Sequence, residues 1–147
     1  MSSFAHALKP ARLVVYWIIF FVPVYLVTIV LYGYWNATLN LFSYLAMQSI
    51  TPLMYILMSW LYFRKVGLET WTARLAVAVI WIFLTILASA ILIQPVYGYD
   101  WRYAINVGVM NAQLVNIAGV LIGSLLASHE RHHRLTKMLK DDTSPSI

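Results

Sequence analysis

Residues 13 to 63 read LVVYWIIFFVPVYLVTIVLYGYWNATLNLFSYLAMQSITPLMYILMSWLYF and contain no Asp, Glu, Lys, Arg or His. Two further uncharged stretches follow, at residues 75 to 99 and 103 to 128. A helix rises about 1.5 Å per residue, so about twenty apolar residues cross the roughly 30 Å hydrocarbon layer of a bilayer. Each later stretch is therefore long enough to span a membrane once, and the first can span it twice.

The composition of the whole chain also indicates a membrane protein. Of its 147 residues, 62% are hydrophobic and 10% are charged, whereas a soluble domain carries about a quarter charged residues. We therefore expect an all-α membrane protein, a bundle of four transmembrane helices. Basic residues precede the first apolar run, as in a signal peptide, but this run is too long and has no cleavage site. We expect it to remain as the first span.

Turn-forming residues divide the three uncharged stretches into four spans. Asn36 and Asn40, with Gly33 upstream, interrupt the first stretch, and a polar link at residues 64–70 separates the second span from the third. The third turn lies at residues 99–102. The expected single domain covers residues 1–140, with spans at 13–34, 41–63, 75–97 and 103–128, a short basic helix after the fourth span, and a disordered polar tail at 141–147.

Lys and Arg residues are unequally distributed between the two ends of this expected bundle. Basic residues resist translocation, so the side that holds more of them is cytoplasmic. Arg102 alone lies on one side, and the other nine lie on the opposite side: Lys9, Arg12, Arg64, Lys65, Arg74, Arg131, Arg134, Lys137 and Lys140. We predict that both termini are cytoplasmic, that the membrane is the bacterial inner membrane, and that these residues contact anionic lipid headgroups rather than nucleic acid.

The residues that usually carry chemistry in membrane proteins are missing from the expected spans. No span contains an ionisable residue, which argues against proton-coupled transport, because such transporters place a carboxylate in the membrane. The spans contain no His for a haem or metal ion, and the chain contains no Cys. Phosphate-binding loops and Ser/His/Asp sets are also missing. We expect no enzymatic activity, no catalytic residue, no cofactor and no metal site.

One cluster after the fourth span has a spacing that can bind a metal ion. His129, His132 and His133 share a face of the expected basic helix. Arg131 and Arg134 place positive charge beside that face, which opposes the binding of a cation. We favour a helix that contacts lipid headgroups, and metal binding stays open as the alternative.

Uncharged polar residues lie at matching depths in the outer halves of the second and fourth spans. They are Gln48, Ser49, Asn111, Gln113 and Asn116. These side chains either hydrogen-bond between helices, at about 0.6 to 2 kcal/mol per pair, or line a cavity that admits an uncharged or zwitterionic solute. We favour the first interpretation.

Small residues follow one another at helical spacing along the fourth span and predict a helix-packing face. They are Gly108, Ala112, Gly119, Gly123 and Ala127, and residues 119 to 123 form a GxxxG motif that lets two helix backbones approach closely. This face can pack inside the bundle or against another protein. Pro23 and Pro52 each fall near the middle of a span, where proline removes a backbone donor and predicts a kink.

These patterns favour a protein that acts through helix contacts, as a homo-oligomer or as an accessory subunit of a membrane assembly. One alternative is a channel or carrier for an uncharged or zwitterionic solute, and another is a lipid- or quinone-handling protein that uses the space between the kinked spans. Size and span number are shared by many classes of membrane protein, so they do not identify a family.

Overall fold

The computed structural model describes residues 9–67, 70–93, 98 and 100–142, and this part of the chain contains helices and no strand. Four helices are long and apolar enough to cross a membrane, so the chain is an all-helical integral membrane protein. Along the chain the elements are α2 (Pro10–Thr38), α3 (Leu41–Val66), α4 (Trp71–Ala88), the π-helical turn η1 (Ser89–Ile93), the 3-10 turn η2 (Trp101–Ile105) and α6 (Val107–Asp142).

The first helix is longer than its sequence predicts. It continues through Asn36 to Thr38, and only Leu39 and Asn40 separate it from α3. The Leu39 amide donates to the carbonyl of Trp35 at 2.6 Å, and the Asn40 side chain accepts from the amide of Phe42 at 2.8 Å. Because these bonds satisfy the helix ends at once, the turn needs two residues instead of six.

The helices of the second half also begin and end at capping residues. Thr70 accepts from the amide of Ala73 at 3.3 Å, so α4 begins before the predicted residue 75. The α-helix gives way to η1 at Ser89, and the predicted end of this span at 94–97 lies outside the described residues. Asn106 accepts from the amide of Val109 at 2.9 Å, which places the start of α6 at Val107 instead of 103.

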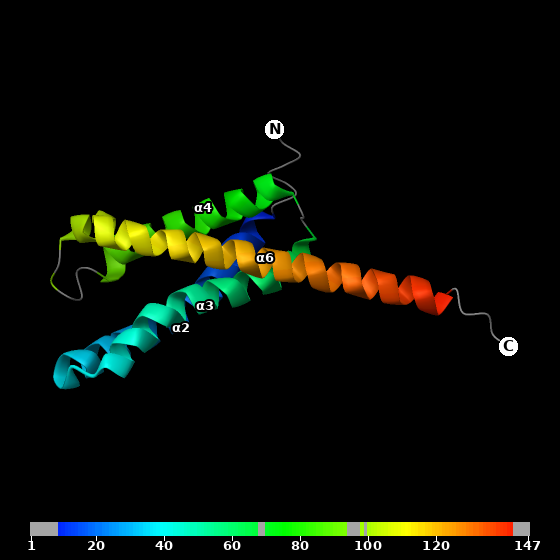
Figure 1. The fold of residues 1–147 in the computed structure, drawn as a ribbon. Coiled ribbons are helices and arrows are strands. Elements are labelled where there is room, and N and C mark those ends of the chain that lie inside the picture. Colours follow the sequence, from blue (N-terminus) through cyan, green and yellow to red (C-terminus); the bar gives the residue numbers. More distant parts are fainter. Residues whose placement is uncertain (1–8, 68–69, 94–97, 99, 143–147) are drawn as a thin grey trace.

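The last helix is continuous from the fourth span into the expected basic segment. It extends well beyond the other helices at one end of the molecule (Figure 1). Asp141 and Asp142, which we expected in a disordered tail, belong to this helix, and residues 143–147 lie outside the described part.

Two antiparallel hairpins make up the bundle, α2 with α3 and α4 with α6, and α3 also runs parallel to α6 (Figure 1). We call the end with the α2–α3 turn and η2 the distal end, and the end from which α6 extends the proximal end. The two hairpins cross near the proximal end and diverge toward the distal end (Figure 1). The contact between hairpins is therefore confined to one half of the molecule.

An aromatic core fills the proximal half, where the four helices meet. Trp81, Tyr62, Phe63 and Val77 are fully buried there. The Tyr62 ring lies edge-on to Trp81, with centroids 5.4 Å apart, and to Tyr16 of α2, with centroids 5.8 Å apart. The Trp81 indole also donates to the carbonyl of Leu13 at 3.1 Å, so the core joins α2, α3 and α4.

Candidate functional site

The backbones of α3 and α6 approach closely at the GxxxG motif. A Cβ atom on Gly119 would lie 2.9 Å from the carbonyl oxygen of Pro52, and one on Gly123 would lie 2.2 Å from that of Ile56. Only glycine permits backbones this close. The Ser59 hydroxyl donates to the carbonyl of Val120 in the same contact. We call this contact the α3–α6 seam.

The predicted helix-packing face is divided by the divergence of the hairpins. Gly119, Gly123 and Ala127 are buried within the bundle, whereas Ala112 and Gly108 lie nearer the distal end and are exposed. A Cβ atom on Gly108 would meet only the side chain of Asn106, the residue that caps the start of α6, at 3.3 Å. The GxxxG motif therefore serves the fold of the chain itself, and two small residues of the stripe stay open.

The predicted intramembrane polar residues do not gather around one cavity. Asn116 is 4% exposed and donates to the side-chain oxygen of Gln113 at 2.9 Å, within α6. Gln48, Ser49 and Asn111 are exposed, and none of their side chains has a hydrogen bond to a side chain or backbone group in the described part of the chain. The structure thus brings together one pair of the five.

Both prolines predicted to kink their spans lie inside continuous helices, Pro23 in α2 and Pro52 in α3. Pro52 lies at the distal end of the α3–α6 seam, where its carbonyl oxygen lies next to Gly119. Gln48, one helical turn earlier, lies on the same stripe of α3 that contacts α6 further along.

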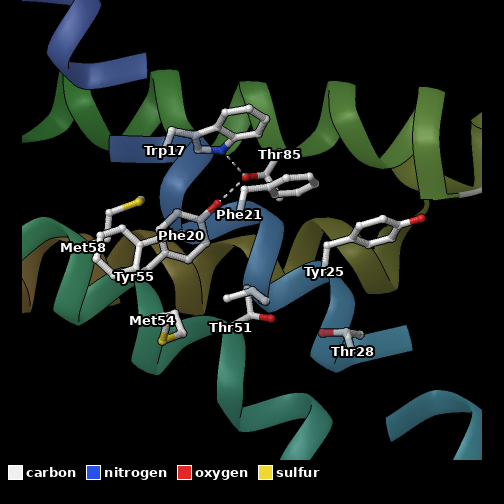
Figure 2. Close-up of a pocket in the computed structure, with 11 residues that line it drawn as sticks. Trp17, Phe20, Phe21, Tyr25, Thr28, Thr51, Met54, Tyr55, Met58 and Thr85 are labelled. Carbon is white, nitrogen blue, oxygen red and sulfur yellow. Dashed lines mark hydrogen bonds between the residues drawn. The ribbon is translucent and has the colours of Figure 1, made fainter. Parts of the chain in front are cut away.

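An apolar pocket of about 150 Å³ lies between α2, α3 and α4 (Figure 2). It was not predicted from the sequence, because its walls come from segments 30 to 68 residues apart. Most of its walls are aromatic rings and methionines, and three threonines add hydroxyl groups. The lining residues are Trp17, Phe20, Phe21, Val24, Tyr25, Thr28, Thr51, Met54, Tyr55, Met58 and Thr85.

One wall of this pocket carries a hydrogen-bonded group of three side chains, which we call the Thr85 cluster. The Trp17 indole donates to the Thr85 hydroxyl oxygen at 3.0 Å, and the Tyr55 hydroxyl is hydrogen-bonded to the same oxygen (Figure 2). Each residue comes from a different helix. Thr85 lies four residues before η1, where the regular α-helical pattern of α4 ends.

A charged network lies at the proximal end, around Glu130 of α6. Its carboxylate is 3.3 Å from the Arg64 guanidinium, accepts from the Trp60 indole at 3.1 Å, and is also paired with Arg134. Arg131 donates to the carbonyl of Phe63 at 2.8 Å. Two of the predicted headgroup-contacting arginines thus share an intramolecular carboxylate and a third holds the end of α3.

Arg74, which we also predicted to contact headgroups, lies inside the bundle. It is 5% exposed, and its guanidinium donates to the Ser128 hydroxyl at 2.7 Å and lies 5.1 Å from the centre of the Trp71 ring. These contacts join the start of α4 to α6. The basic residues at this end therefore divide between structural contacts and an exposed surface.

The network around Glu130 predicts that stability falls at acidic pH. Desolvation raises the pKa of Glu130, but the hydrogen bond from Arg134, the charges of Arg64 and Arg134, and the Trp60 indole outweigh it and hold the pKa below its ordinary value of 4.5. A carboxyl with a lower pKa in the folded state stabilises the fold above its unfolded pKa, and this contribution is lost as pH falls through the folded pKa. We expect the Tm to drop below about pH 4.5.

Melting curves in detergent between pH 7 and pH 3 measure this effect. Glu130→Gln should lower the Tm at neutral pH and flatten its fall in acid, whereas Asp100→Asn, at the distal end, should retain the wild-type profile. Equal profiles for wild type and Glu130→Gln would show that the network does not stabilise the fold.

The described residues contain no group of three His, Cys, Asp or Glu side chains placed to hold a metal ion. His129, His132 and His133 are all exposed on α6. The candidate functional features are therefore the unpaired distal amides, the apolar pocket with its Thr85 cluster, and the proximal charges. Comparisons of the chain with protein-family models, with curated proteins and with solved structures give no match.

Proposed function

We propose that this chain acts through helix contacts within the membrane, as a homo-oligomer or as an accessory subunit of a larger assembly. The surface that carries these contacts is the distal surface, formed by the diverging halves of α3 and α6 with Gln48, Ser49, Asn111, Ala112 and Gly108. The supporting observation is that the amides of Gln48 and Asn111 are exposed and have no partner in the described part of the chain.

The depth of these amides makes their exposure costly in a bilayer. Gln48 lies about 10 Å along α3 from its distal start, and Asn111 about 6 Å along α6 from its start. A polar group without a hydrogen bond in hydrocarbon costs several kcal/mol, whereas an interhelical hydrogen bond contributes about 0.6 to 2 kcal/mol. A hydrogen bond to another helix would remove the cost of the unpaired amide and stabilise the contact.

The shape of the distal surface also suits a helix. Gly108 and Ala112 carry little or no side chain, so a neighbouring backbone can approach α6 closely there. Apolar side chains flank the amides, including Leu45 of α3, which is 52% exposed. The GxxxG motif is not available to a second protein, because Gly119 and Gly123 contact α3 of the same chain. The channel or carrier alternative gains no support, since the apolar pocket is lined by none of the five predicted polar residues.

Photo-crosslinking in native membranes tests this proposal. A photoreactive amino acid at Ser49 on the distal surface should give a discrete adduct, of twice the chain mass for a homo-oligomer or of another defined mass for an accessory subunit. The same amino acid at Val30, which is 69% exposed on α2, is the matched control and should label lipid. Absence of a discrete adduct at Ser49, or equal adducts at both sites, would contradict the proposal.

Replacing both distal amides should weaken assembly without unfolding the chain. Gln48→Leu combined with Asn111→Leu removes no described intramolecular hydrogen bond. The free energy of unfolding of the isolated chain should therefore change by no more than about 0.5 kcal/mol. Two interhelical bonds contribute about 1 to 4 kcal/mol, so the Ser49 adduct should fall by at least about fivefold. Asn36→Leu, an exposed amide outside this surface, should leave the adduct unchanged.

A further inference from the structure

The Thr85 cluster has more hydrogen-bond donors than it uses. Trp17 supplies one N–H, and Tyr55 and Thr85 supply one O–H each. Two hydrogen bonds join the three side chains, so two of the three hydrogens are engaged. Whichever hydroxyl donates in the Tyr55–Thr85 bond, the hydrogen of the other has no acceptor among the described residues.

A threonine or serine in a helix can donate its hydroxyl hydrogen to a backbone carbonyl of the preceding turn. Thr38 does so with the carbonyl of Tyr34 at 2.8 Å, and Ser128 does so with that of Ser124 at 3.3 Å. Thr85 makes no such bond in the described contacts, because its oxygen is turned toward Trp17 and Tyr55. The spare donor therefore lies at the wall of the apolar pocket.

The remaining walls restrict what this donor can bind. Apart from the Thr85 cluster, the pocket presents aromatic rings, methionines and a valine, together with the hydroxyls of Tyr25, Thr28 and Thr51. No charged side chain is among the described residues that line it, so an ionic ligand would lose its hydration without compensation. A ligand that fits this environment is apolar and carries an oxygen that accepts one hydrogen bond.

From this arrangement we infer that the pocket binds a neutral, apolar carbonyl compound, with the carbonyl oxygen accepting the spare hydrogen of Tyr55 or Thr85. A prenylated quinone has this chemistry, with ring carbonyls and an apolar chain. This binding site is independent of the helix-contact surface proposed above, which lies on α3 and α6.

The depth of the cluster separates a free carbonyl compound from a membrane phospholipid. Thr85 lies about 21 Å along α4 from Trp71, and Tyr55 about 17 Å along α3 from its proximal end, so the donor is near mid-membrane. The ester carbonyls of phospholipids lie at the edges of the hydrocarbon layer, attached to headgroups that stay in water. A ligand without a charged headgroup can reach the cluster without the free-energy cost of placing a charge in the hydrocarbon layer.

The inference is tested with a matched pair of probes on the purified full chain. One probe is a short-chain prenylated benzoquinone, and the other is a hydrocarbon of the same shape without carbonyl oxygens. Binding is measured by competition with a fluorescent quinone in detergent micelles, and a diacyl phosphatidylethanolamine serves as a third competitor. The wild type should bind the quinone at least about fivefold more tightly than the hydrocarbon, the ratio that one hydrogen bond supplies.

Three variants locate the effect. Thr85→Val alone would free the Trp17 N–H, which donates to the Thr85 hydroxyl oxygen. The triple variant Trp17→Phe, Tyr55→Phe and Thr85→Val removes all three donors of the Thr85 cluster and should abolish the preference for quinone over hydrocarbon. Thr28→Val, which removes a hydroxyl elsewhere in the same pocket, should keep that preference. Val24→Trp fills the pocket and should prevent binding of both probes.

Four results would overturn the inference. The first is the absence of quinone binding to the wild type. The second is a preference for quinone that survives in the triple variant, and the third is unchanged binding in Val24→Trp. Tighter competition by the phosphatidylethanolamine than by the quinone would assign the pocket to phospholipid and likewise overturn it. Should the triple variant fail to fold, Val24→Trp and the wild-type affinities for quinone and hydrocarbon still decide the outcome.

Discussion

Gly123→Leu is expected to prevent the four-helix bundle from folding. A Cβ atom at this position would lie 2.2 Å from the carbonyl oxygen of Ile56 and 2.9 Å from both the Ser59 hydroxyl and the Trp60 amide. Two of these three atoms belong to the α3 backbone, which cannot move aside without separating the helices. Overpacking of a well-packed core costs about 1 to 3 kcal/mol per substitution, and a leucine wedged between two backbones exceeds that range.

The protein with the smaller change Gly123→Ala should fold but melt at a lower temperature. Its free energy of unfolding should fall by about 1 to 3 kcal/mol. Gly33→Ala is the matched control, because a Cβ atom there has no neighbour within 4 Å and alanine favours a helix over glycine by up to about 1 kcal/mol. Melting temperatures in detergent and the yield of monodisperse protein measure all three variants. Equal Tm values for Gly123→Ala and Gly33→Ala would rule out the α3–α6 seam as described.

Trp81→Ala is expected to cost about 3 to 5 kcal/mol, the range found for buried aromatic residues truncated to alanine. The Trp81 side chain is fully buried, packs edge-on to Tyr62, and donates its indole hydrogen to the carbonyl of Leu13. Its removal leaves a cavity where α2, α3 and α4 meet. Lipid chains compete with helix contacts in a membrane, so packing rather than water exclusion sets this cost.

Trp81→Phe separates packing from hydrogen bonding, because phenylalanine retains a ring and loses the bond to Leu13. It should cost less than Trp81→Ala and more than Trp101→Ala, an exposed tryptophan whose truncation should stay within about 0.5 kcal/mol. Denaturant or thermal melts of the three variants rank these effects. A Trp81→Ala protein as stable as Trp101→Ala would show that the aromatic core does not hold the hairpins together.

The two proposals respond differently to these changes. The distal surface on α3 and α6 and the pocket on α2, α3 and α4 share only one helix, so the Gln48 and Asn111 substitutions should leave quinone binding unchanged. Conversely, removal of the Tyr55 and Thr85 hydroxyls should leave the Ser49 adduct intact. Loss of both functions together would indicate a folding defect rather than either site.

The small-residue stripe shows how far sequence reasoning reaches in this chain. Its periodicity identified Gly119 and Gly123 as a packing face, because helical spacing is a local property. Which part of the stripe packs inside the chain, and which part stays open at Gly108 and Ala112, depends on the angle at which α3 crosses α6. The sequence carries no local signal for that angle.

The Thr85 cluster and the Glu130 network lie further beyond the reach of sequence. Trp17 meets Thr85 across 68 residues, and Trp60 meets Glu130 across 70. No spacing rule links such positions, and each side chain alone resembles many others in apolar helices. Arg74 likewise looks like another interfacial arginine until the fold buries it against Ser128.

The sequence by itself determined that this chain forms four helices long and apolar enough to cross a membrane, because apolar length is read along the chain and a backbone in hydrocarbon must satisfy its hydrogen bonds locally. The tertiary structure alone decided where the hairpins touch and diverge, which amides stay unpaired, and that a pocket with a spare donor lies between α2, α3 and α4. These features depend on the crossing angle and register of helices, which are set by contacts such as Gly123 on Ile56, between residues far apart in the chain.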